Sequence, residues 1–195
     1  IAQHFKRKIL GSKITKRIEP YHPEFTDYVL VKGLLHRLDH AASAHEKVEM
    51  HAKESIAEYT LNAFGRGKLR ELQQFALANQ EKNLVLVAST GLGKTEAGFL
   101  WLGREKGIFT LPLRVSINAI FKRTMEKIGY VEKNKPIAGL LHSSARDYLE
   151  KHVIEEDETD SYSNEQIFYQ SRLLSRKLTL TTIDQVLTFP LLFKG

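Results

Sequence analysis

The sequence has no cysteine among its 195 residues. Disulfide bonds and thiolate metal sites are therefore excluded, and a cytoplasmic protein is the simplest expectation. The chain also lacks an uninterrupted apolar run of membrane-spanning length, a signal-peptide pattern in its first residues, and any tract rich in Ser, Pro or Gly. These absences argue against a membrane protein, a secreted protein and a wholly disordered chain.

The composition is that of a globular protein with a moderate positive charge. Hydrophobic residues make up 42% of the chain, enough for a packed core, and the formal net charge is +6. A positive charge favours anionic partners such as nucleic acid, but many soluble proteins of other functions are equally basic. The chain begins with Ile1 rather than Met, which predicts that it is a piece of a longer protein.

Two different hydrophobic patterns divide the chain near residue 65. Between residues 23 and 53, apolar residues recur every three or four positions and predict an amphipathic helix with one buried face. Those apolar residues are Val31, Leu34, Leu35, Leu38 and Ala42. Gly65 and Gly67 then break the pattern. We therefore predict an all-α region over residues 1–65 and an α/β domain over residues 66–195.

The second region alternates short apolar runs with helical patterns. Four runs predict strands, namely "NLVLVAST" (83–90), "GIFTLPL" (107–113), "KPIAGLLHS" (135–143) and "KLTLTTIDQ" (177–185). Helices are expected around residues 68–78, 94–104 and 114–128. Strands that alternate with helices predict a parallel sheet in an α/β layer fold. The acidic stretch "EEDETDSYSNEQ" (155–166) is expected to be a solvated insertion without metal-ligand spacing.

The segment "ASTGLGKT" (88–95) approaches the phosphate-binding motif G-x-x-x-x-G-K-[ST], with Ala88 in place of the first glycine. Gly91 and Gly93 allow the backbone to turn sharply, so that its amides can surround a phosphate at a helix N-terminus. Lys94 is predicted to reach the β- and γ-phosphates and the Thr95 hydroxyl to bind Mg²⁺. The predicted nucleotide-binding residues are Ser89, Thr90, Gly91, Leu92, Gly93, Lys94 and Thr95, with Lys94 and Thr95 as the catalytic pair.

Further polar residues follow the other predicted strands. In an open parallel sheet, ligands bind at the carboxyl ends of the strands, where His142 and Ser143 are expected to be exposed and Thr181 and Thr182 to lie at the same edge. A protein can bind the backbone phosphates of a nucleic acid with hydrogen-bond donors alone, without recognising the bases. The candidates for such contacts are Arg114, Ser116, Asn118, His142, Ser143, Thr181 and Thr182. Asp184 can equally serve as the N-cap of the helix that follows the fourth strand.

Together these motifs resemble the CRISPR-associated helicase-nuclease of type I systems. The motifs that carry the resemblance are "ASTGLGKTEAG", "LPLRVSINAIFKR", "LLHSSA" and "LTTIDQVLTFPLL", and it extends over most of residues 68–195. The family implies a RecA-like motor domain of superfamily 2 that uses ATP and Mg²⁺ to move 3′ to 5′ on single-stranded DNA. It also implies a CRISPR RNA-guided surveillance complex as partner, and Gln73 as the residue that reads the adenine edge. From the residues alone, an exposed polar position on a helix is an equally good interpretation of Gln73.

The stretch "KGLLHRLDHAASA" (32–44) resembles the last block of the metal-dependent HD nuclease domain of the same family. The resemblance implies that Asp39 is a ligand of a divalent transition metal and that Ser43 lies near the active site. The spacing of His36, Asp39, His40 and Ser43 places them on one helix face, although such residues are more often simply surface residues. The His-Asp pair that gives the domain its name is expected before Ile1.

ATP hydrolysis needs a further carboxylate motif, D-E-x-H or D-E-x-D, which does not occur before Gly195. In the family it follows "TTIDQVL", so we expect this chain by itself to bind nucleotide weakly and not to turn it over. Three alternatives stay open. They are a general superfamily-2 DNA or RNA helicase without a nuclease, a P-loop kinase or nucleotide switch, and a degenerate nucleotide-binding scaffold. The intact Lys94 and Thr95 argue against the last of these.

Overall fold

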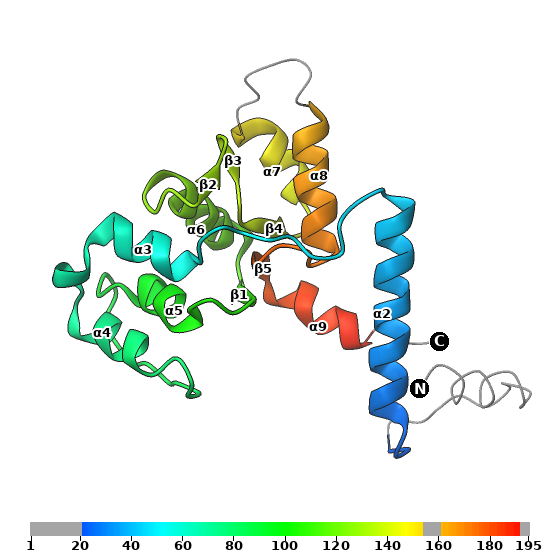
Figure 1. Ribbon diagram of the computed structural model, residues 1–195, viewed down its shortest axis with the longest axis horizontal. Coiled ribbons are helices and arrows are strands. Elements are labelled where there is room, and N and C mark those ends of the chain that lie inside the picture. Colours follow the sequence, from blue (N-terminus) through cyan, green and yellow to red (C-terminus); the bar gives the residue numbers. More distant parts are fainter. Residues whose placement is uncertain (1–20, 154–160, 192–195) are drawn as a thin grey trace, which may run out of the picture.

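A computed structural model of the chain describes residues 21–153 and 161–191 (Figure 1). Its centre is a parallel three-stranded sheet in the order β1-β5-β4. The strands are β1 (Gly107–Leu111), β5 (Leu178–Thr182) and β4 (Gly139–Leu141). The chain is therefore an α/β protein with a parallel sheet, as the alternation of strands and helices predicted.

Eight α-helices occur in the described residues. They are α2 (Phe25–Ser43), α3 (Ile56–Phe64), α4 (Glu71–Ala78), α5 (Lys94–Leu102), α6 (Arg114–Glu126), α7 (Ala145–His152), α8 (Ser161–Arg172) and α9 (Ile183–Leu191). A 3₁₀ turn, η1 (Arg66–Lys68), precedes α4, and a short antiparallel pair joins β2 (Val131–Glu132) to β3 (Lys135–Pro136). Helices α3, α4 and α5 pack together, whereas α6 packs against β1 and β5 and α8 packs against β4 (Figure 1).

The central strand β5 is buried on both faces, and it pairs with β1 on one side and β4 on the other. Its apolar side chains join one core cluster with residues from the surrounding helices. Fully or almost fully buried members are Phe99, Ile117, Phe121, Leu140, Leu149, Ile167, Leu178 and Leu180. Burial of each such side chain contributes roughly 1.5–3 kcal/mol, so this cluster is the main stabilising element of the described fold.

Helix α3 begins at a capping box. The Ser55 hydroxyl accepts the Glu58 amide at 3.2 Å, and the Glu58 carboxylate accepts the Ser55 amide at 3.1 Å. This exchange satisfies two backbone donors that a helix start would otherwise leave unpaired. The helix then packs Ala57 and Leu61 against Leu100 of α5. Helix α3 thus contributes to the same packed unit as α5, while the division of the chain near residue 65 stays a prediction.

The first predicted strand, residues 83–90, does not form a strand in the structure. Val85 and Val87 are each 93% exposed. An isolated extended segment has no neighbour to satisfy its backbone N–H and C=O groups, and within the described residues no strand runs alongside it. The prediction was wrong at this point because an apolar run specifies a strand only where a partner strand is present.

The amino-terminal helix also departs from its prediction. Helix α2 ends at Ser43 rather than near residue 53, and Ala41 is the buried residue that the structure records in it. Leu34, Leu35 and Leu38 are 53%, 60% and 43% exposed, so the expected buried face is uncovered within the described part of the chain. Arg37 connects α2 to the sheet domain, because its Nε donates to the Leu173 carbonyl at 2.7 Å.

Smaller differences concern the second half of the chain. The predicted strand at residues 135–143 is divided between β3 and β4. Residues 161–166 of the expected acidic insertion form the start of α8, and residues 154–160 lie outside the described residues. Helix α7 was not predicted. Of the helices that the structure describes, none is both long enough and apolar enough to cross a membrane.

Candidate nucleotide and nucleic-acid site

The glycine loop has the backbone conformation that its sequence predicted. Gly91 and Gly93 have φ angles of +83° and +82°, a region that side-chain-bearing residues rarely adopt. A Cβ added at Gly91 would meet nothing within 4 Å, so the requirement for glycine there is conformational. A Cβ at Gly93 would in addition overlap the amide nitrogen of Gln73. Both positions therefore require glycine.

The loop ends where helix α5 begins, at Lys94. The Leu92 amide donates to the Ser89 carbonyl at 3.4 Å and closes the turn. Within the described part of the chain, the amides of Gly93, Lys94 and Thr95 have no hydrogen-bond partner. Free amides at a helix N-terminus carry partial positive charge and suit an anion such as a phosphate.

Lys94 lies over this loop. Its Nζ donates to the carbonyls of Ala88 and Ser89 at 2.7 and 3.0 Å, and the side chain is exposed to solvent. Ser89, Thr90 and Leu92 are likewise exposed, whereas Thr95 is half-buried. The ammonium group is held by main-chain carbonyls that a phosphate could replace as its partners. The donor set of the loop therefore fits a phosphate group.

Gln73 lies beneath the loop and is only 7% exposed. Its Oε1 accepts the Arg70 amide at 3.0 Å, and its Nε2 donates to the Gly93 carbonyl at 3.4 Å. The Arg70 guanidinium donates to the carbonyl of Gly91. In this structure Gln73 and Arg70 attach the start of α4 to the phosphate loop. The adenine-reading role of Gln73 stays a prediction, and sequence reasoning missed Arg70.

A second group of predicted residues meets where β4 ends and α6 begins. His142 is 2% exposed, so the expectation that it is exposed at the strand end was wrong. Its Nε2 lies 2.8 Å from Asn118 Oδ1, and its Nδ1 accepts the Ser144 amide at 3.3 Å. These partners require a neutral ring that carries its proton on Nε2. Burial, reinforced by the charge of Arg114, lowers the pKa of His142 below its usual value, which favours this neutral form.

Arg114 is the exposed cation of this group. Its Nη1 donates to Ser143 Oγ at 3.2 Å and to Ser144 Oγ at 3.3 Å. Ser116 is half-buried in the first turn of α6. The structure thus pairs Arg114 with Ser143 and Asn118 with His142, and Ser144 contacts both Arg114 and His142. Arg114 and Ser143 present donors to solvent, whereas Asn118 and His142 hold the two elements together.

The predicted residues of the fourth strand have a different environment. Thr181 is fully buried, and its hydroxyl donates to the Leu141 carbonyl at 2.7 Å. Thr182 is 2% exposed. The pKa of Asp184 is lowered, first by a hydrogen bond from the Thr182 side chain. Thr181 therefore joins β5 to β4, and both threonines are buried at the end of the strand where the sequence placed them.

Asp39 is exposed on α2, as is Ser43. The rings of His36 and His40 lie with their centroids 6.4 Å apart on the same helix. No group of three or more His, Asp or Glu residues that could hold a metal ion occurs in the described ranges, 21–153 and 161–191. The residues of α2 that the structure describes do not form a metal site by themselves, and Asp39 stays a predicted ligand.

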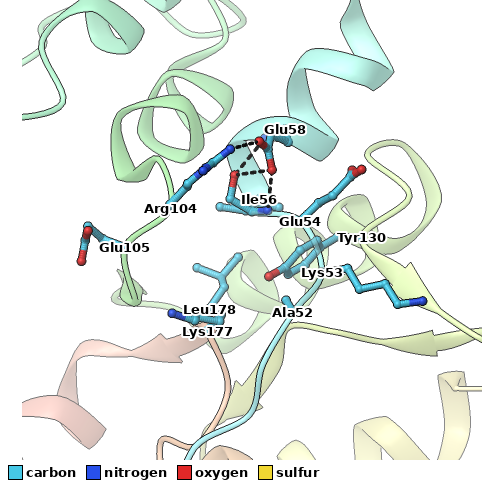
Figure 2. Close-up of a pocket in the computed structure, with 11 residues that line it drawn as sticks. Ala52, Lys53, Glu54, Ile56, Glu58, Arg104, Glu105, Tyr130, Lys177 and Leu178 are labelled. Atoms are coloured by element: carbon cyan, nitrogen blue, oxygen red, sulfur yellow. Dashed lines mark hydrogen bonds and ion pairs between the residues drawn. The ribbon is translucent and has the colours of Figure 1, made fainter.

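A cavity of about 320 Å³ lies elsewhere, near the start of β5 (Figure 2). Its lining includes Lys177, Tyr130 and an ion pair, in which Arg104 Nη2 lies 2.9 Å from Glu58 Oε1. Burial raises the pKa of Tyr130 to about 12, so its phenol stays neutral. The cavity is at the amino end of β5, whereas the predicted site residues follow the carboxyl ends of the strands.

A parallel sheet flanked by helices, with a left-handed glycine loop at the start of α5, defines an α/β protein whose loop carries the sequence pattern of the P-loop class. Comparison with curated proteins identifies the relatives. The chain is 34% identical over 182 residues, 90% of its length, to the CRISPR-associated nuclease/helicase Cas3 of Methanothermobacter thermautotrophicus. It is 30% identical over 118 residues, 56% of its length, to a protein assigned as a CRISPR-associated nuclease/helicase Cas3 in Methanocaldococcus jannaschii.

The chain covers 21% of the first relative and 15% of the second, so it spans about a fifth or less of their length. No family model matches it, and no solved structure matches it significantly. This chain is therefore a homologue of part of the CRISPR-associated nuclease/helicases, and the resemblance predicted from its motifs is confirmed.

Proposed function

We propose that this chain is part of an ATP-dependent helicase that moves on single-stranded DNA and acts, with a nuclease activity, in CRISPR antiviral defence. The observation that carries the proposal is the loop of residues 89–95, in which two glycines with positive φ angles precede Lys94 and three amides have no partner among the residues that the structure describes. The names of the relatives, helicase and nuclease, support the same conclusion.

In this proposal the loop holds the phosphates of ATP. The amides of Gly93, Lys94 and Thr95 donate hydrogen bonds to the phosphate oxygens, the Lys94 ammonium binds the β- and γ-phosphates, and the Thr95 hydroxyl would bind Mg²⁺. When bound by Thr95, Mg²⁺ would supply positive charge beside the phosphates. Preorganised donors of this kind stabilise developing charge without reorganisation during the reaction.

The DNA-binding part of the proposal rests on Arg114 and Ser143, which present donors near the start of α6. Contact with backbone phosphates needs charge and hydrogen bonds but no base recognition, as expected of a motor that moves over any sequence. A CRISPR RNA-guided surveillance complex is the proposed partner. We further propose that Asp39 contributes to a metal-dependent nuclease site whose other ligands are outside the described residues.

The phosphate assignment is tested by Lys94→Ala in the complete protein. Loss of the cation that contacts the β- and γ-phosphates is expected to lower the DNA-stimulated rate of ATP hydrolysis by at least about 100-fold. Lys151→Ala, which removes an exposed cation from α7, is the matched control and should retain the rate. Unchanged turnover in Lys94→Ala would contradict the phosphate assignment, and turnover without DNA stimulation would favour a P-loop kinase or switch.

The nuclease assignment is tested by Asp39→Ala in the same preparation. Cleavage of single-stranded DNA should fall while ATP hydrolysis stays largely intact, because α2 is separate from the phosphate loop. Asp147→Ala, at an exposed position of α7, is the control. If Asp39→Ala loses both activities while keeping its fold, Asp39 is not a nuclease ligand.

A further inference from the structure

The phosphate-loop helix contains a carboxylate that the proposed reaction does not use. Glu96 lies two residues after Lys94 in the first turn of α5 and is only 2% exposed. Its partner is Arg123 of α6, whose Nη2 forms an ion pair with Glu96 Oε1. Burying an ion pair costs several kcal/mol of desolvation for each ion, which the attraction between the two ions rarely exceeds by much. Stability alone is therefore a weak reason for this pair.

The other carboxylate oxygen of Glu96 faces the phosphate loop. A Cβ built on Gly93 would lie 3.4 Å from Glu96 Oε2 and would also overlap the amide of Gln73. Glu96 thus lies directly behind the residue whose left-handed conformation turns the loop into the helix. The Glu96 carboxylate therefore lies beside the point at which the loop enters α5.

The partner helix leads to the proposed DNA site. Helix α6 runs from Arg114 to Glu126 without interruption, with Arg114 and Asn118 in its first two turns and Arg123 in its last turn. The helix is therefore a rigid connection between Arg114, a proposed DNA-phosphate donor, and the guanidinium of Arg123 that holds Glu96. Helix α5 packs mainly on α3 and α4, and α6 on β1 and β5. Phe99 of α5 shares the core cluster with Ile117 and Phe121 of α6, so the ion pair adds a polar link between two helices that already share a core.

We propose that Glu96 and Arg123 are positioning residues that couple DNA binding at the start of α6 to the geometry of the phosphate loop. When a DNA phosphate binds Arg114, a shift of α6 moves Arg123, and the ion pair transmits that shift to Glu96 and Gly93. This inference rests on the proposed function of both sites. Coupling of this kind is demonstrated only by measuring the interaction free energy between the sites.

The test measures ATP hydrolysis by the complete protein with and without single-stranded DNA, and compares the ratio of the two rates. Arg123→Gln should lower this ratio by at least about fivefold, because the link to the loop is lost. Glu96→Gln should lower it similarly, and the double variant should lower it no further than either single one, as expected for two members of one pair. Arg123→Lys, which retains the charge, should restore part of the stimulation.

Lys122→Gln is the matched control, since Lys122 is the exposed neighbour of Arg123 and its ion pair with Glu126 stays within α6. A full stimulation ratio in a folded Arg123→Gln protein would overturn the coupling role. Because Arg123 is 37% exposed, this variant remains informative even if Glu96→Gln does not fold. Loss of turnover in Lys94→Ala combined with normal stimulation in Arg123→Gln would refute the coupling alone. A parent protein without DNA stimulation would refute the proposed function and the coupling together.

Discussion

Strand β5 and the segment before the phosphate loop have similar sequences and opposite environments. Residues 178–182 read LTLTT and are all buried, whereas residues 84–88 read LVLVA and include two valines that are 93% exposed. The difference is that β5 has a parallel neighbour on each side, and the other segment has none in the described chain. An apolar run therefore forms a strand only where neighbouring strands are present to pair with it.

Two helices repeat this contrast. Helix α6 buries Ile117 and Phe121 completely against the sheet, while α2 leaves Leu34 and Leu35 more than half exposed. Both helices carry apolar residues at helical spacing, but only α6 has a sheet to cover. The following predictions test this difference on the 195-residue chain, from the largest expected effect to the smallest.

The largest effect is expected for Leu180→Ala in the centre of β5. Leu180 is fully buried, so its truncation should lower the free energy of unfolding by about 3 kcal/mol through lost burial and a cavity. Val87→Ala should change it by less than about 0.5 kcal/mol, because Val87 is exposed. Urea denaturation of the two variants measures both values. Equal costs would show that residues 84–88 are packed like β5.

A smaller effect is expected for Thr181→Val, which keeps the shape of the side chain and removes its hydroxyl. The Leu141 carbonyl would lose the hydrogen bond that Thr181 donates, and we expect a loss of about 1 kcal/mol in the free energy of unfolding. Thr90→Val, at an exposed position beside the glycine loop, is the matched control. If Thr181→Val has the same free energy of unfolding as the parent chain, this hydrogen bond does not stabilise the pairing of β5 with β4.

The smallest effect concerns the pH dependence of stability. Because burial lowers the pKa of folded His142, the unfolded chain takes up a proton at this residue at a higher pH than the folded chain does. The free energy of unfolding should therefore decrease as the pH falls below the usual histidine pKa of about 6.5. Thermal unfolding at several pH values measures this effect. In His142→Asn, the free energy of unfolding should fall less steeply with decreasing pH than in the parent chain. The control is His36→Asn, at an exposed position of α2, which should follow the parent chain. Parallel curves for His142→Asn and the parent would contradict the burial of a neutral ring.

Local patterns predicted several elements well. The helices that begin at Lys94 and Arg114 start where the sequence placed them, and β1 and β5 lie within their predicted ranges. The positive φ angles of Gly91 and Gly93 also follow from the motif. These features depend on neighbouring residues in the chain, so a single sequence is sufficient to predict them.

Long-range contacts could not be predicted in the same way. The burial of His142 depends on Asn118, which is 24 positions away, and the ion pair of Glu96 depends on Arg123 in another helix. Neither residue carries a signal for its partner in its own surroundings. Glu96 follows Thr95 in the first turn of a helix, and from the sequence alone a glutamate at such a position is typical of a solvent-exposed residue.

By itself, the sequence determined the α/β class, the glycine loop with its lysine, and the resemblance to CRISPR-associated nuclease/helicases, because these depend on residue types at short spacing. Only the tertiary structure decided which apolar runs became strands, which helix face was covered, and which of the polar residues at the strand ends were exposed. Those outcomes depend on what packs beside each residue, and folding brings together segments whose order along the chain does not reveal their neighbours.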